Sequence, residues 1–333
     1  MSLQQLTATE VSKRLGLHDD FFPWLKELEA LEQTGSTFAL PAIGERDELL
    51  ARLHIEPEDA AEIISAWPQP TLPPEWWWLL QRCHQQLVAQ IDTPTLSLPS
   101  WQPLPSHLGA MGRLFYVYVF LATLPTIRQW HRERGIPDEI SWATLADLGE
   151  NIAIYRRMVG ETSLNTPQWP MRHFSGTLYR LGRLQFERTY FLGETNPTVS
   201  NVDLQPSALS VHIPESGGSL EPSACDQSFE QARRFFARHF PEETYHIAQC
   251  SSWLLDPQLA DYLPPTSHII RFQQRFHLLP DGITDDQNIM RYVFRRIAPA
   301  LDELPQRTTL QQAIVRHIRA GKHWQIRTGW LKL

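Results

Sequence analysis

Hydrophobic residues in the first 160 positions recur at three- and four-residue spacing, the period of a helix with one buried face. Phe22, Leu25, Leu28 and Leu31 follow this spacing. Comparable patterns, with Thr or acidic residues at several starts, predict helices over 7–17, 22–31, 56–67, 75–91, 108–134 and 141–159. Pro125 predicts that the helix over 108–134 is kinked or divided. The first half of the chain is therefore expected to be mainly helical.

Beyond position 160 the pattern turns toward alternation, which is typical of strands with one buried face. Strands are predicted as a pair within 177–191, and over 208–213, 245–255, 268–279 and 322–331. A helix is predicted over 219–239, because apolar side chains fall on one helical face at Cys225, Phe229, Ala232, Phe235, Phe236 and Phe240. Another is predicted over 308–320. The expected fold class is α+β.

Composition and charge favour a packed globular protein and disfavour a nucleic-acid-binding one. Hydrophobic residues form 42% of the 333 positions and charged residues 20%, as in a packed protein. Residues 1–140 carry 10 basic and 18 acidic residues, for a net charge of −8, and residues 141–333 carry a net charge of +1. Because no Lys/Arg-rich patch is present, nucleic-acid binding is not expected.

The cysteines and the apolar runs indicate in which cellular compartment the protein is found. Cys83, Cys225 and Cys250 are far apart and odd in number, which favours a reducing compartment over a disulfide framework. No Cys/His spacing is that of a metal site. The N-terminus lacks the pattern of a signal peptide, and the longest apolar run, 114–124, is too short to span a bilayer. A cytoplasmic protein without a membrane partner is expected.

The stretch PESGGSLEP, residues 214–222, is a turn between a predicted strand and a predicted helix. Gly217 and Gly218 would let a ligand approach the backbone, Ser219 is a candidate helix cap, and the helix N-terminus attracts phosphates. Glu215 and Glu221 would repel an anion, and such a turn needs glycine for its own geometry. Phosphate binding and a plain turn both remain open.

Four segments, 169–188, 211–241, 253–276 and 317–331, resemble a bacterial family of acyltransferase-domain proteins. The resemblance implies a helical N-acyltransferase N-terminal domain over 1–138. It implies a GNAT-like domain over 139–333, a mixed β-sheet with flanking helices. An acyl-CoA, with acetyl-CoA named first, would donate its acyl group directly to a small-molecule amine or hydroxyl.

The same resemblance implies where the donor would lie. In the GNAT architecture a loop after one strand binds the CoA pyrophosphate through its N–H groups, and the next strand splays away to admit the pantetheine arm. This loop corresponds to Gly217, Gly218, Ser219 and Leu220, although PESGGS departs from the usual Gln/Arg-x-x-Gly-x-Gly/Ala pattern. The departure keeps a second hypothesis open, in which the chain is a non-catalytic small-metabolite binding protein.

Acyl transfer needs a base for the nucleophile and an acid for the leaving thiolate. Beside the implied opening, His212 and Glu215 are candidate bases, and Ser252 is a candidate partner of the thiolate. Each also has a structural interpretation, as a strand histidine, a solvated turn carboxylate and a strand serine. Cys250 is expected to serve packing rather than nucleophilic attack.

Candidate acceptor residues lie on the first strand pair and after the second parallel strand. Arg183, Gln185 and Glu187 alternate and would share one face, either as an acceptor pocket or as an ion-pair ladder. Trp253 would form a wall of that pocket or a core contact. The run Trp76–Trp78 cannot place all three rings on one helix face, so at least one is expected to meet another domain, a ligand or solvent.

Overall fold

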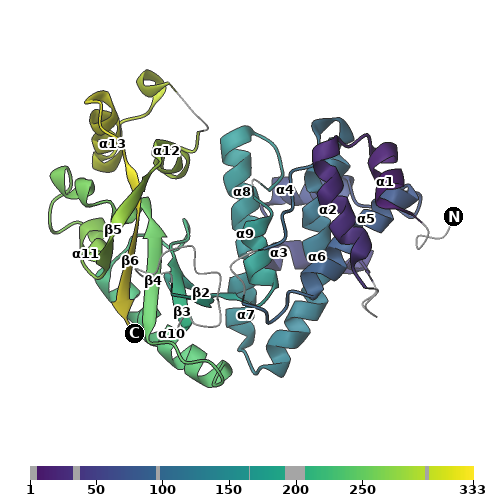
Figure 1. Ribbon diagram of the computed structural model, residues 1–333, viewed down its shortest axis with the longest axis horizontal. Coiled ribbons are helices and arrows are strands. Elements are labelled where there is room, and N and C mark those ends of the chain that lie inside the picture. The colour runs from purple at the N-terminus through teal and green to yellow at the C-terminus, as the bar shows by residue number, and fades with distance from the viewer. Residues whose placement is uncertain (1–5, 33–37, 95–97, 165, 192–206, 297–299) are drawn as a thin grey trace. The chain divides into compact units, whose positions relative to one another are not determined.

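The computed structural model describes residues 6–32, 38–94, 98–164, 166–191, 207–296 and 300–333 (Figure 1). The chain divides into two compact units, Met1–Leu178 and Tyr179–Leu333. The segment 139–178, which the sequence analysis placed in the second domain, is therefore part of the first unit. It belongs there because its buried side chains, Leu145, Leu148, Ile152 and Phe174 among them, join the core of the helical unit.

The first unit is helical, as the spacing of its apolar residues predicts. Its α-helices are α1 (Ala8–Leu15), α2 (Phe22–Ala30), α3 (Arg46–Arg52), α4 (Pro57–Ser65), α5 (Pro74–Val88), α6 (Gly109–Glu133), α7 (Asp138–Leu145), α8 (Asp147–Val159) and α9 (Gln168–Phe174). Its 3₁₀ turns are η2 (Asp19–Phe21), η3 (Ile43–Glu45) and η4 (Ser106–Leu108). Local signals set the ends: Thr7 and Glu10 form a capping box on α1, and Gly16 ends it in a left-handed conformation.

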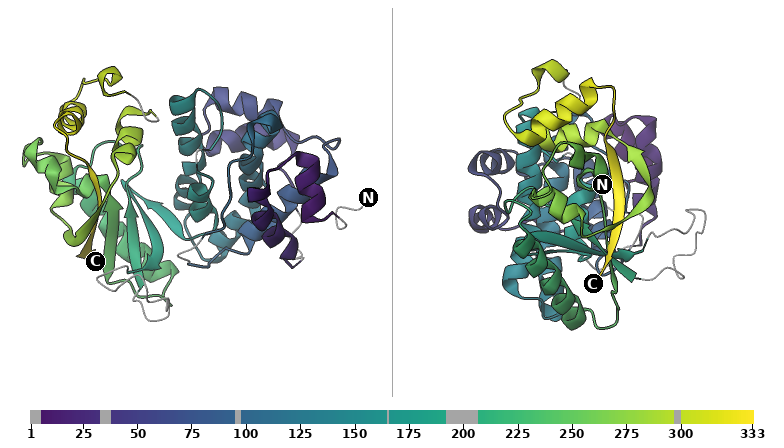
Figure 2. Two further views of the ribbon diagram at one scale, coloured as in Figure 1. Left: turned by 45° about the horizontal axis from the view of Figure 1, so that its top comes forward. Right: turned by 90° about the vertical axis from the view of Figure 1, so that its left-hand side faces the viewer.

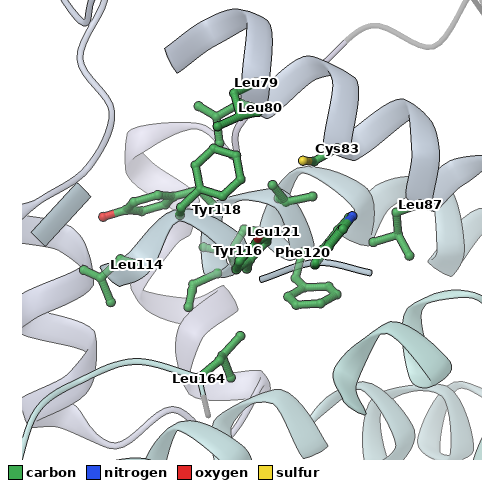
Figure 3. Close-up of a cluster of buried hydrophobic side chains, with 14 of the residues drawn as sticks. Leu79, Leu80, Cys83, Leu87, Leu114, Tyr116, Tyr118, Phe120, Leu121 and Leu164 are labelled. Atoms are coloured by element: carbon green, nitrogen blue, oxygen red, sulfur yellow. The ribbon is translucent and has the colours of Figure 1, made fainter. Parts of the chain in front are cut away.

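Helix α6 is the centre of this unit. Figure 3 shows side chains of α5 and α6 packed together with Leu164, among them Leu79, Leu80, Cys83, Leu87, Leu114, Tyr118, Phe120 and Leu121. The segment Ser106–Glu133 is long and apolar enough to cross a membrane, but 72% of its apolar window is buried, as in a core helix. Pro125 does not divide α6, which runs as one helix from Gly109 to Glu133 with the proline inside it. Of the two predicted alternatives, a kinked helix and a divided one, the divided one is wrong.

The second unit is built on a six-stranded mixed sheet, which can be followed from two further directions in Figure 2. Its strands are β1 (Leu178–Leu181), β2 (Leu184–Tyr190), β3 (Ser207–His212), β4 (Ile247–Ser252), β5 (His277–Thr284) and β6 (Gln325–Lys332), in the spatial order β1-β2-β3-β4-β6-β5. The pair β3–β4 is parallel, whereas β2–β3, β4–β6 and β5–β6 are antiparallel. A helical unit followed by a mixed, mainly antiparallel sheet with flanking helices confirms the α+β class.

Helix α10 (Pro222–His239) covers one face of the sheet. Its apolar stripe is the predicted one: Phe229 contacts Phe186 of β2, and Phe235 contacts Tyr179 of β1, with ring centroids 5.5 and 4.8 Å apart. The unit also contains α11 (His268–Gln273), α12 (Asp286–Phe294), α13 (Thr309–Arg319) and the 3₁₀ turns η6 (Trp253–Leu255), η7 (Pro257–Asp261) and η8 (Leu301–Glu303).

The strand predicted over 268–279 is wrong in its first half. Residues His268–Gln273 form α11, and only from His277 does the chain become strand β5. The alternation of Ile270 and Phe272 suggested a strand, but Phe272 and Phe276 lie four residues apart and their rings are in contact at 5.2 Å. The spacing of these apolar residues therefore also fits a short helix followed by a strand.

Candidate functional site

The two parallel strands β3 and β4 pair over a short stretch. In the part of the chain that the structure describes, this pairing joins Leu209 to Ala248 and Ser210 to Gln249, and goes no further. Beyond it, β3 pairs with β2 up to His212, and β4 pairs with β6 up to Ser252. The inner edges of the two strands therefore stop bonding to each other halfway along, which is the separation that the resemblance implied.

The loop that follows β3, residues 213–221, lies at this end of the sheet. Gly217 and Gly218 have φ of +94° and +81°, a region that favours glycine. The prediction that Ser219 caps the helix is wrong: α10 begins at Pro222, with Glu221 as its N-cap. Proline at this first position loses no hydrogen bond, so it fixes the start of the helix three residues later than expected.

Four backbone N–H groups of this loop make no hydrogen bond to the part of the protein that the structure describes. Within the described residues, the backbone N–H groups of Gly217, Gly218, Ser219 and Leu220 donate to no protein acceptor. Unpaired N–H groups just before a helix form an anion-binding concavity. The arrangement suits a phosphate.

Two arginines of the β1–β2 hairpin hold the opposite side of the loop. Arg183 donates from Nη1 to the carbonyl of Pro214 at 3.0 Å and from Nε to the carbonyl of Ser219 at 3.2 Å. Arg180 donates to the hydroxyl of Ser216 at 2.8 Å and to its carbonyl at 3.3 Å. We call Arg180 and Arg183 the hairpin arginines.

His212, at the end of β3, contacts Glu187 of β2. The distance from its Nε2 to Oε2 of Glu187 is 2.8 Å, and the two side chains are 23% and 14% exposed. In the strand register His212 lies opposite Gln185, so Glu187 reaches it diagonally on the same face of the sheet. A carboxylate oxygen accepts, so Nε2 of His212 donates and Nδ1 carries the lone pair when the ring is neutral.

The other candidate residues have defined contacts. Glu215 forms an ion pair with Arg295, which follows α12. Ser252 ends β4, and its Oγ accepts a hydrogen bond from the N–H of Leu254 at 3.1 Å, so its own proton is left to donate. Trp253 is buried at the start of η6.

Family models match both parts of the chain. An N-acyltransferase N-terminal domain matches residues 44–176 and a GNAT-like C-terminal domain matches residues 178–331. Three solved structures of acyltransferases are similar over 98% of this chain and 100% of theirs. One is a mutant in complex with octanoyl-CoA, at 42% identity and a TM-score of 0.90; one is in complex with CoA and 10C-Teicoplanin, at 42% and 0.91; one is in complex with decanoyl-CoA, at 40% and 0.91.

The chain belongs to this acyltransferase family. No curated protein sequence matches it significantly. The acyltransferase uses an acyl-CoA as donor and a small molecule as acceptor, which confirms the function expected from the resemblance. The alternative of a non-catalytic binding protein has no support in these comparisons.

Within this acyltransferase, Cys250 is not a nucleophile. Its side chain is buried on β4, and burial raises the pKa of its thiol to about 12, so the thiolate is absent at neutral pH. No group of three or more His, Cys, Asp or Glu side chains in the described ranges is placed to hold a metal ion.

The predicted residues of the acyltransferase fall into two groups around the strand separation. Glu187, Gln185 and His212 lie together on one face of β2 and β3, whereas Arg183 lies in the hairpin turn with its guanidinium on the loop. The acceptor roles of Arg183, Gln185, Glu187 and Trp253 stay predictions.

Sequence reasoning did not assign roles to Arg180 or Arg295, although both contact the loop. Arg295 leaves no sequence signal. For Arg180 the signal was the spacing Arg180–Gly182–Arg183, a tight turn with a cation on either side.

Proposed function

We propose that this acyltransferase moves an acyl group of the octanoyl to decanoyl class from CoA to an amine of a teicoplanin-like molecule. Relatives in complex with octanoyl-CoA, and with decanoyl-CoA and teicoplanin, support this choice. The longer donor replaces acetyl-CoA, which the sequence analysis named first. The free, buried cysteines support a reducing compartment such as the cytoplasm.

The observation that carries the proposal is the end of β3–β4 pairing beside the glycine loop. Beyond Ser210 and Gln249 no registered pairing joins β3 to β4 in the described residues, so the facing edges of the two strands could bind the amides of a pantetheine arm, as strand edges bind an added peptide. The pyrophosphate would lie on the N–H groups of Gly217, Gly218, Ser219 and Leu220. The thioester would then lie between the ends of β3 and β4.

His212 is the base in this scheme. Its Nδ1 takes a proton from the acceptor amine as the nitrogen attacks the thioester carbonyl, while Glu187 holds Nε2–H. The C–N bond forms, the C–S bond breaks, and CoA leaves as a thiolate. Glu215 is the weaker candidate for this role, because Arg295 already holds its carboxylate.

Ser252 is the candidate hydrogen-bond donor to the thiolate. It ends β4, and its Oγ accepts from the N–H of Leu254, so its hydroxyl proton is left to donate. The proton that the thiolate finally takes comes from the imidazolium of His212, because a serine hydroxyl is a weaker acid than a thiol. Gln185 and Trp253 remain the candidates for contact with the acceptor, since Gln185 is opposite His212 in the register.

A calorimetric titration tests the site. Decanoyl-CoA, octanoyl-CoA and acetyl-CoA are titrated into the protein and into the variants Gly217→Glu and Gly218→Glu. We expect the decanoyl donor to bind more tightly than the acetyl donor. We also expect both variants to weaken it by about tenfold or more. At Gly218 the carboxylate would repel the pyrophosphate and occupy its place, whereas at Gly217 the new side chain would press on Arg180 and displace the loop.

Gly321→Glu is the matched control. Gly321 has φ of +73°, close to the +81° of Gly218, and at both positions an added Cβ meets nothing within 4 Å. The control therefore adds the same strain and the same charge at the end of α13. Equal weakening in the control and in Gly218→Glu, or no weakening in either, would remove the loop from the donor site.

A further inference from the structure

The hairpin arginines bind the backbone of the loop at three carbonyls in six residues. Arg183 takes those of Pro214 and Ser219, and Arg180 takes that of Ser216. These contacts hold the loop at its two ends and at its middle.

Each of these bonds fixes the direction of an N–H group. In a trans peptide the C=O of one residue and the N–H of the next point in opposite directions, and no cis peptide occurs in the described chain. Turning the carbonyl of Ser216 toward Arg180 therefore turns the N–H of Gly217 away from it. The carbonyl of Ser219 does the same for the N–H of Leu220.

The hairpin itself is anchored to α10, so the arginines have a rigid base. Ser228 of α10 accepts hydrogen bonds at its Oγ from the N–H groups of Arg183 (2.9 Å) and Leu184 (3.3 Å), and donates to the carbonyl of Ala224. Gly182 forms the turn with φ of +72°, and a Cβ there would lie 2.9 Å from this oxygen. The hairpin is therefore in direct contact with the helix.

Gly217 is packed on the hairpin arginines and Gly218 is open. A Cβ at Gly217 would lie 3.1 Å from Nη2 of Arg180, whereas a Cβ at Gly218 would meet nothing within 4 Å. The loop therefore has an inner side, filled by guanidinium groups, and an outer side with space for a ligand.

We propose that Arg180 and Arg183 are positioning residues of the donor site, which hold the carbonyls of the loop inward so that its N–H groups face the donor pyrophosphate. The inference rests on the proposed function, because it assumes that this loop receives the phosphates. The arginines act through the backbone and need not touch the donor. Arginine suits the task because its planar fork donates to two carbonyls from separate nitrogens in a fixed geometry, whereas the three donors of a lysine share one nitrogen at the end of a flexible stem.

The experiment compares two donors, of which only one carries the pyrophosphate and the adenosine nucleotide attached to it. Decanoyl-CoA and decanoyl-pantetheine are titrated into the wild type, Arg183→Lys and Arg180→Lys. Both substitutions keep the charge and remove the fork. We expect decanoyl-CoA to bind about ten- to hundredfold more weakly in Arg183→Lys, with a smaller loss in Arg180→Lys. The affinity for decanoyl-pantetheine, which has no pyrophosphate, should stay unchanged and also shows that the variant is folded.

Arg233→Lys is the control, since Arg233 is an exposed arginine of α10 that pairs with Glu230 and does not contact the loop. Equal loss for both donors would mean that the hairpin arginines only support the fold, and no loss would mean that the loop keeps its form without them. A wild type that does not prefer decanoyl-CoA would refute the phosphate site itself, so the two failures can be told apart. If Arg183→Lys does not fold, Arg180→Lys decides the question.

Discussion

Arg156 in the helical unit and Arg183 in the sheet unit have different kinds of partner. Arg156 of α8 donates to three carboxylates of α4, those of Asp59 (2.5 Å), Glu58 (2.8 Å) and Glu62 (3.2 Å). Arg183 donates to two backbone carbonyls of one loop. The contacts of Arg156 hold one helix against another, whereas those of Arg183 set the direction of peptide groups.

His84 and His131 of the helical unit contrast with His212 of the sheet unit. His84 and His131 are buried in the helical unit, and each is hydrogen-bonded to a hydroxyl, of Thr123 at 3.0 Å and of Ser141 at 2.6 Å. Burial lowers the pKa of His84 to about 4, and burial with the nearby Arg128 lowers that of His131 to about 3. His212 ends a strand at the sheet separation and contacts a carboxylate. Only the last arrangement suits a base.

The largest expected effect tests the histidine of the sheet unit. His212→Ala should lower kcat by about 10²- to 10⁴-fold, the usual contribution of a general base, with little change in the KM for the acyl-CoA. The rate is measured by mass spectrometry with decanoyl-CoA and teicoplanin. His18→Ala, at an exposed position of the helical unit, is the control and should keep the wild-type rate. A kcat for His212→Ala within about threefold of the wild type would rule out this base.

The next effect tests the arginine of the helical unit. Arg156→Met should lower the free energy of unfolding by about 3 kcal/mol, because the carboxylate of Asp59, 1% exposed, would be buried without its cation. Urea unfolding followed by tryptophan fluorescence measures this change. Arg132→Met, at an exposed arginine of α6, should change it by less than about 0.5 kcal/mol. A similar loss in both variants would contradict the structural role of Arg156.

The smallest effect is a pH dependence of the helical unit. The folded pKa values of His84 and His131 lie below the ordinary value of 6.5. The unfolded chain therefore takes up protons first as the pH falls below about 6.5, and stability is lost from there toward pH 4 for His84 and pH 3 for His131. Between pH 7 and pH 5 the loss should be about 2 kcal/mol for each histidine, since one pKa unit corresponds to about 1.4 kcal/mol.

His84→Gln sharpens this test, because an amide can still donate to Thr123 but does not titrate. Urea unfolding at pH 7, 6 and 5 should give a shallower dependence on pH in the variant than in the wild type. Identical slopes for the two proteins would show that His84 is not buried in its neutral form.

Local patterns were enough to predict the helical unit, the stripe of α10 and the glycine turn. Each depends on residues within a few positions of one another, as Cys225, Phe229 and Ala232 do. The start of α10 was misplaced because Ser219 is a favoured cap residue, whereas the helix begins at Pro222 and its N-cap, Glu221, makes no side-chain cap bond. These errors are a few residues long.

The contacts of the site were harder to predict from sequence. The spacing of Arg183 and Glu187 predicts that they share one face of a strand. In the structure Arg183 lies in the turn at Gly182, its N–H bonds to Ser228, and its guanidinium contacts the loop instead. The contact between Glu187 and His212 requires the register of two strands separated by 16 residues, 191–206. Such pairings are set by the packing of the whole unit, which no local pattern contains.

The short parallel pairing between β3 and β4 also suggests how the two halves of the site could be exchanged between related genes. It divides the sheet into β1–β2–β3, which includes His212, and β4–β6–β5, which includes Ser252. The first half, its loop and α10 are continuous in the chain up to His239, and the second half begins at Ile247. A recombination between two related genes in the segment from 240 to 246 would exchange one half and leave the other whole. This fold can therefore acquire a new half-site in a single genetic event.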